Sequence, residues 1–187
     1  MKLWTIQKPV AYADLIKNGF YRTDSSYISS DKLTAYDWQA EQLSQRVSSP
    51  PEGVSHPVWA WYKLYNEQKK PDFRNAGYAP TGTELVCMEL EVPDSLVLLS
   101  DYDDWTFVLQ GLYVHDTGKD ELFDYETSML EAMSEEQRTR AVRNSWNKIF
   151  DIRSVFTSKG CRGINVQGAM WEIRKEYIRK TWTFKAK

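Results

Sequence analysis

The chain has few of the residues that form the commonest metal, redox and phosphate sites. Its 187 residues include two cysteines and two histidines, and none of the four stands at metal-ligand spacing. A catalytic zinc ion takes about three protein ligands, so we expect no metal site. Two cysteines without a CxxC spacing favour free thiols over a disulfide framework. The nine glycines do not cluster, which argues against a phosphate-binding glycine loop.

Long apolar runs and a strong excess of one charge are also missing. No run approaches the roughly 20 apolar residues that a membrane-spanning helix needs, and Thr5, Gln7 and Lys8 interrupt any apolar leader. The formal net charge is −2, so the molecule as a whole does not attract nucleic acid. We expect a cytoplasmic protein of bacterial or phage origin, without a membrane partner. The oligomeric state stays open.

Charge is nevertheless unevenly distributed. Residues 120–136 hold seven acidic and no basic residues, whereas residues 172–187 hold six basic and two acidic ones. The basic segment also contains Trp182 and Phe184, so one interpretation is a surface that contacts phosphates and stacks on bases. The other, which we favour, is an edge strand protected by lysine and arginine.

Apolar spacing predicts one α+β domain over residues 1–187, with a mixed or antiparallel sheet and flanking helices. The clearest strand is 85–92, where apolar residues alternate with polar ones. Pro9 is placed to open a helix and Gly19 to end it. We expect further strands at 3–7, 58–64, 96–99 and within 163–184, and further helices at 31–47, 101–112 and 138–150.

Two Trp-centred segments stand at opposite ends of the chain, at residues 3–7 and 166–173. Both have the pattern of strands that carry polar side chains out of an aromatic setting. Small α/β enzymes often hold a ligand between paired first and last strands, so we expect these two to pair. The chain also has eight Trp and eleven Tyr, which fit either an aromatic core or rings that stack on a flat ligand.

Three polar residues are candidates for chemistry. Arg74 follows Pro-Asp-Phe in a polar loop and offers a planar fork for a diphosphate or carboxylate. It could equally form a surface pair with Asp72. Glu172 lies within the expected last strand, where it is either a catalytic carboxylate or a cross-strand partner of Arg174. Gln167 lies just before that strand.

The segments LWTIQ, AYDW, PDFR, SWNKIFD and VQGAMWEI resemble a bacterial and phage family known only as a domain of unknown function. The resemblance covers essentially the whole chain. It implies no activity by itself.

The opening is also similar to the first strand and helix of ADP-ribosyltransferases, especially those that modify nucleic acids. Such enzymes bind NAD with polar groups of the first strand and carry a glutamate on a late strand. The resemblance implies NAD contacts at Thr5 and Gln7, with Glu172, or alternatively Gln167, as the catalytic residue. Stacking and diphosphate binding would then fall to Trp59, Trp61 and Arg74.

We therefore expect an ADP-ribosyltransferase-like enzyme that transfers ADP-ribose from NAD to a macromolecular acceptor, either nucleic acid or protein. Such an enzyme would act as a toxin or a phage-conflict factor. The alternative is a non-catalytic module that binds nucleic acid or protein through its aromatic surface and basic C-terminal strand. Binding of NAD would separate the two.

Overall fold

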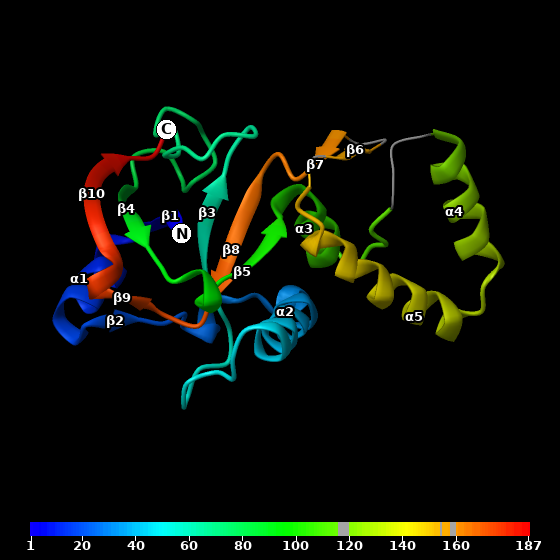
Figure 1. The fold of residues 1–187 in the computed structure, drawn as a ribbon, viewed down its shortest axis with the longest axis horizontal. Helices are drawn as coiled ribbons and strands as arrows, with labels where there is room; N and C mark the ends of the chain where they lie inside the picture. Colours follow the sequence, from blue (N-terminus) through cyan, green and yellow to red (C-terminus); the bar gives the residue numbers. More distant parts are fainter. Residues whose placement is uncertain (116–119, 154, 158–159) are drawn as a thin grey trace.

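The computed structural model describes residues 1–115, 120–153, 155–157 and 160–187 of the chain. Its centre is an antiparallel sheet in the order β10-β4-β1-β3-β8-β5 (Figure 1). The strands are β1 (Lys2–Gln7), β3 (Val58–Lys63), β4 (Glu84–Glu91), β5 (Leu98–Asp101), β8 (Val166–Met170) and β10 (Ile178–Lys185). Two short pairs flank it, β2 (Phe20–Tyr21) with β9 (Ile173–Arg174), and β6 (Val155–Thr157) with β7 (Gly160–Arg162). The predicted α+β class is confirmed.

Five α-helices accompany the sheet in the described part of the chain: α1 (Pro9–Asn18), α2 (Leu33–Arg46), α3 (Tyr102–Leu109), α4 (Asp120–Ala132) and α5 (Glu135–Ser145). Pro9 opens α1, and Gly19 ends it with a left-handed φ of 84°, as predicted. None of the described helices is long and apolar enough to cross a bilayer.

Three predicted helices have other bounds in the structure, and the first of these, α3, ends at Leu109 rather than at residue 112. The helix predicted from residue 31 begins only at Leu33, because Asp31 lies in a 3-10 turn, where it accepts a hydrogen bond from the Ser29 hydroxyl. The helix predicted over 138–150 is divided: α5 starts earlier, with Ser134 as its cap, and the chain then tightens into a 3-10 helix from Trp146 to Phe150.

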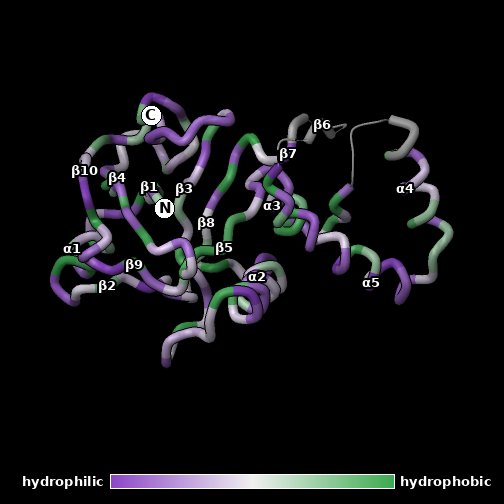
Figure 2. The backbone as a smooth tube through the Cα atoms, viewed as in Figure 1, coloured by the Kyte–Doolittle hydropathy of each residue, from purple (hydrophilic) through white to green (hydrophobic). Residues whose placement is uncertain are grey.

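The two faces of the sheet have different cores. One face packs aliphatic side chains of β1, β3, β4 and β8 against Leu15 of α1. The other face packs rings of α2, α3 and the 3-10 helix, with Trp59 of β3 lying 5.0 Å from Trp105 between ring centroids. Figure 2 shows apolar residues along β8 and β5, beside these helices. Several tryptophans therefore serve the core rather than the surface.

The two Trp-centred strands are not neighbours, so the predicted pairing of first and last strands is wrong. β3 lies between β1 and β8, and β4 lies between β1 and β10. The registers instead align Trp4, Trp61, Gln167 and Ser100 in one row across four strands. Glu172 also lies outside the strands, between β8 and β9, because the chain bends after Met170.

The free-thiol prediction holds for Cys87, which is buried in β4. Burial raises the pKa of its thiol to about 12, so it stays protonated and unreactive at neutral pH. The side chain of Cys161 lies outside the described part of the structure.

We expect the stability of the fold to depend on pH because of the buried Asp101. Its buried carboxylate accepts backbone hydrogen bonds from Asp104 (2.8 Å) and Gly163 (2.5 Å), and burial raises its pKa to about 6. The folded state therefore binds this proton more tightly than the unfolded chain, so the unfolding free energy falls as pH rises from about 4 to about 6. Urea denaturation should show a flatter pH profile for Asp101→Asn than for the wild type. Parallel profiles would mean that Asp101 is ionised throughout.

Candidate functional site

The sheet opens between β1 and β3. β1 pairs with β4 at six positions but with β3 only through Trp4 and Trp61. Beyond this bridge, the Thr5 hydroxyl donates to the Trp59 carbonyl oxygen at 2.9 Å. The sheet thus divides into β10-β4-β1 and β3-β8-β5, and a pocket of about 410 Å³ lies at the division. We call it the split pocket.

Five of the seven predicted site residues line the split pocket. They come from both Trp-centred segments and from β3, which lies between them: Thr5, Gln7, Trp59, Trp61 and Gln167. The two ends of the chain therefore contribute to one pocket, although the two strands do not pair.

Gln167 has the most informative side chain in the split pocket. It is only 6% exposed, yet its Nε2 meets no hydrogen-bond acceptor among the described residues. The buried indole nitrogen of Trp59 also meets no hydrogen-bond acceptor among the described residues. A buried donor without an acceptor costs about 1–3 kcal/mol, and such donors call for an explanation in a native structure. An amide donor at the wall of a pocket is suited to a ligand carbonyl.

Thr5 and Gln7 form the β1 wall of the split pocket. The buried Thr5 hydroxyl donates to Trp59 and also accepts from Gln7 Nε2 at 2.8 Å. Thr5 is thereby engaged in holding the two halves of the sheet together. Gln7 is oriented by this contact, so of the two it is the better placed to meet a ligand.

Arg74 lines a larger adjoining pocket of about 910 Å³, which we call the loop pocket. The two pockets share Trp61, Gly77 and Tyr78, so they are contiguous. The exposed Arg74 guanidinium donates to both carboxylate oxygens of Asp72, at 3.0 and 2.7 Å, and holds the pKa of Asp72 well below its usual range. The surface pair is therefore present, but an exposed pair contributes little and an anionic ligand can compete for it.

Glu172 is not among the described residues that line either pocket. Its side chain is 13% exposed, and Arg22 and Arg174 bind its two carboxylate oxygens at 2.9 and 2.7 Å. Both carboxylate oxygens of Glu172 are thus bound by arginines, as in a structural ion pair. Arg22, which lies 150 residues away, is a partner that spacing along a strand does not reveal.

Sequence reasoning missed the segment after β2, which forms the rim of the split pocket. Thr23 donates to the Pro57 carbonyl oxygen at 2.8 Å, and Ser25 Oγ lies 2.8 Å from His56 Nδ1. Asp24 caps the 3-10 turn Ser25–Tyr27 by accepting a hydrogen bond from the Ser26 backbone N–H at 2.9 Å. Among the described lining residues of the split pocket, Asp24 alone is acidic. The Asp-Ser-Ser pattern could have indicated the turn, but not its position beside β3.

A third pocket, of about 660 Å³, adjoins the split pocket at a different border from the loop pocket. It shares Gln7, Tyr21 and Asp24 with the split pocket and extends to Arg22 and α1. The split pocket therefore lies between two larger hollows, and Asp24 stands at one of the borders.

Residues 2–179 match the family described as a domain of unknown function (DUF3841). The chain belongs to this family. Both Trp-centred segments and all seven candidate residues fall within the matched region. No curated protein and no solved structure matches the chain. The family description states no activity.

Proposed function

We propose that this protein is an ADP-ribosyltransferase-like enzyme that binds NAD across the split and loop pockets and transfers ADP-ribose to a macromolecular acceptor. The observation that carries the proposal is the opening of the sheet between β1 and β3. It brings polar groups of both Trp-centred segments to one pocket, beside the unpartnered amide of Gln167.

The split pocket suits the nicotinamide end of NAD. Its volume of about 410 Å³ lies in the usual range for small-ligand sites. Trp59 and Trp61 provide apolar ring surface for a flat heterocycle. Gln167 Nε2 provides a donor for the carboxamide oxygen, and this contact would remove the cost of the buried, unpartnered amide.

The loop pocket suits the diphosphate. It is lined by Lys69, Lys70 and Arg74, with Asp72 as the one acidic residue among its described lining residues. The net positive charge attracts phosphate, and the arginine fork can bind two phosphate oxygens at once. Because Trp61 lies in both pockets, one extended ligand can occupy them together.

Transfer breaks the bond between the ribose C1′ and the nicotinamide nitrogen, and nicotinamide leaves as the neutral base. An acceptor nucleophile forms the new bond to C1′ and loses its proton, and positive charge develops on the ribose between these events. A carboxylate near that carbon would stabilise the charge. We assign this role to Asp24, because it lines the split pocket and hydrogen bonds from Ser26 lower its pKa and keep it ionised. Glu172, the residue that the resemblance implies, is already bound by two arginines.

The contacts of β10 give less support to the alternative binding module. Phe184 stacks on Phe73 with the ring centroids 4.1 Å apart, and Lys70 Nζ lies 3.5 Å from the centroid of Phe73 and 5.5 Å from that of Trp182. Phe184 and Trp182 of β10 thus contact the loop at residues 69–78, which leaves less of their ring surface for a partner.

The proposal is tested by incubating the protein with NAD and measuring nicotinamide release, with RNA, DNA or a protein lysate as the acceptor. We expect NAD-dependent labelling of one acceptor class. Isothermal titration with millimolar NAD that gives no heat, together with an unchanged melting temperature, would remove the proposal.

Gln167→Leu should separate binding from stability. We expect NAD affinity to fall about 10-fold or more, because a hydrogen bond of at least ~1.4 kcal/mol is lost. Stability should stay the same or rise, since a buried donor without an acceptor is removed. Ser100→Ala is the matched control: Ser100 is buried in the same row, its hydroxyl is also unpartnered, and it does not line the split pocket. Calorimetry and urea denaturation measure both quantities. Equal NAD affinity in the leucine variant and the wild type would contradict the assignment.

A further inference from the structure

The hairpin that follows β3 has an unusual backbone. Tyr65 and Asn66 have φ values of 53° and 63°, and they are the only non-glycine residues with positive φ in the described part of the chain. Leu64 and Glu67 exchange backbone hydrogen bonds of 2.9 and 3.1 Å around them. Such a two-residue turn favours Asn-Gly, and a tyrosine in the left-handed region is energetically costly.

Contacts from the segment before β8 hold the strained turn in place. The backbone N–H of Tyr65 donates to Asn165 Oδ1 at 3.0 Å, and that of Asn66 donates to the Ile164 carbonyl oxygen at 2.9 Å. The Tyr65 ring gains little from the protein in return, since the residue is 66% exposed. Strain that persists around an exposed ring points to a role for that ring.

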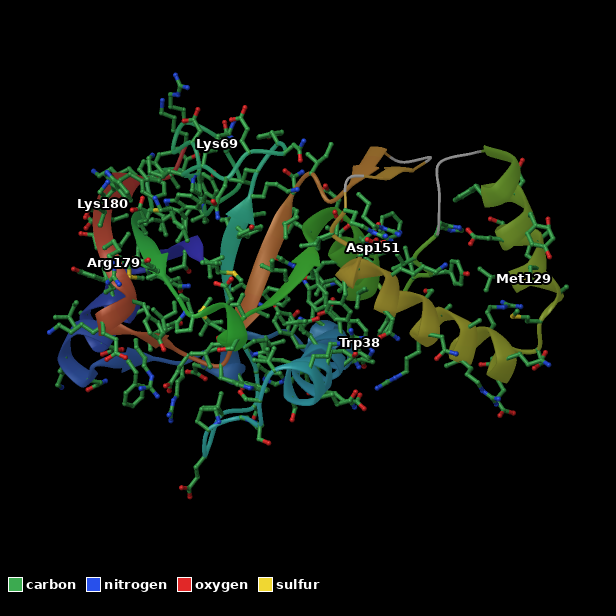
Figure 3. The ribbon with its side chains drawn as sticks, viewed as in Figure 1. Trp38, Lys69, Met129, Asp151, Arg179 and Lys180 are labelled. Atoms are coloured by element: carbon green, nitrogen blue, oxygen red, sulfur yellow. The ribbon has the colours of Figure 1, made fainter. Side chains whose placement is uncertain are left out.

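The surroundings of Tyr65 indicate the ligand. Tyr65 lines the loop pocket together with three cations, and Lys69 Nζ lies 5.8 Å from its ring centroid. Figure 3 shows Lys69 in the loop that follows β3, at the end of the sheet where the C-terminus lies. Trp61 and Tyr102 add a second aromatic wall, with 4.7 Å between their centroids. These aromatic rings and cations together suit a ligand that has a flat ring with negatively charged groups attached near it.

We infer that the loop pocket is a nucleoside diphosphate site in which Tyr65 is the platform for the base. Lys69, Lys70 and Arg74 lie where they can bind the diphosphate, while the exposed ring of Tyr65 offers a stacking face at the rim. The inference deepens the proposed function, on which it rests for identifying the diphosphate as part of NAD. The same chemistry would also accept a free nucleotide such as ADP.

The test compares Tyr65→Asn with the wild type. Asparagine tolerates the left-handed region, so stability should be kept or raised. Affinity for ADP and for NAD should fall at least about 10-fold, since stacking on one base contributes that much, whereas affinity for nicotinamide alone should not change. Tyr65→Phe keeps the ring and should bind as the wild type does. Tyr125→Ala, at an equally exposed tyrosine on α4, is the control for loss of a surface ring.

The outcomes separate this inference from the proposed function. If the wild type binds ADP through Tyr65 but does not bind NAD, the nucleotide site stands and the transferase proposal fails. If Tyr65→Asn binds ADP as tightly as the wild type, the inference is overturned, and retained NAD binding leaves the transferase proposal in place. If a single-stranded oligonucleotide binds and ADP does not, the pocket is a nucleic-acid surface and the inference is also overturned.

Discussion

Asp24→Asn is expected to reduce NAD turnover by about 100-fold or more, whereas Glu172→Gln leaves turnover unchanged. The first change removes the negative charge that the split pocket offers to the developing cation, while it keeps the shape of the side chain and its acceptor for the Ser26 backbone. NAD affinity and folding should therefore persist in the asparagine variant. Nicotinamide release under saturating NAD measures the effect.

Glu172→Gln is the matched control and should instead reduce stability. It weakens contacts to Arg22 and Arg174 at a mostly buried position, for which we expect a loss of about 1–2 kcal/mol of unfolding free energy. Urea denaturation measures this loss. The reverse pattern, with turnover lost in the glutamine variant and kept in the asparagine variant, would return the catalytic role to Glu172, as the resemblance implies.

Gly163→Ala is expected to cost more than about 3 kcal/mol of unfolding free energy. Gly163 has a φ of 78°, and a Cβ atom there would lie 2.3 Å from the Ile152 carbonyl oxygen and 2.7 Å from that of Arg153. Both are backbone atoms, so relief requires the chain itself to move. Gly163 also donates to buried Asp101 just before β8, the strand that carries Gln167.

Gly82→Ala is the control that separates the cost of the Cβ clash at Gly163 from the cost of a positive φ. Gly82 has a similar φ of 86°, but a Cβ atom there would meet no atom within 4 Å. This variant should lose only about 1 kcal/mol, the usual cost of a left-handed alanine. Equal losses in the two variants, measured by urea denaturation, would mean that the chain around Gly163 is packed less closely than described.

Local patterns predicted the parts of the fold that depend on neighbouring residues. Pro9 and Gly19 delimit α1 because each fixes or permits one backbone conformation wherever it stands. Apolar spacing identified β4 because Val86, Met88 and Leu90 recur on one face and pack into the core, and exposed glutamates stand at both ends of the strand. Both signals are carried by residues a few positions apart.

The site depended on contacts that local patterns do not contain. The opening of the sheet lies where β1 pairs with β3 at one position only, and neither strand's sequence indicates it. Asp24 reaches the pocket because Thr23 is tied to Pro57, and Glu172 is bound by Arg22 from the opposite end of the chain. The aromatic and polar character of the pocket was predictable, but the position of Asp24 beside it and the arginine partners of Glu172 were not.

The most direct test of NAD binding in the split pocket is a tryptophan fluorescence titration, because Trp59 and Trp61 line that pocket. The prediction is saturable quenching by NAD that nicotinamide competes away and that Gln167→Leu shifts to about 10-fold higher concentration or more. Fluorescence that does not change saturably with NAD, whether or not an oligonucleotide quenches it, would contradict the account.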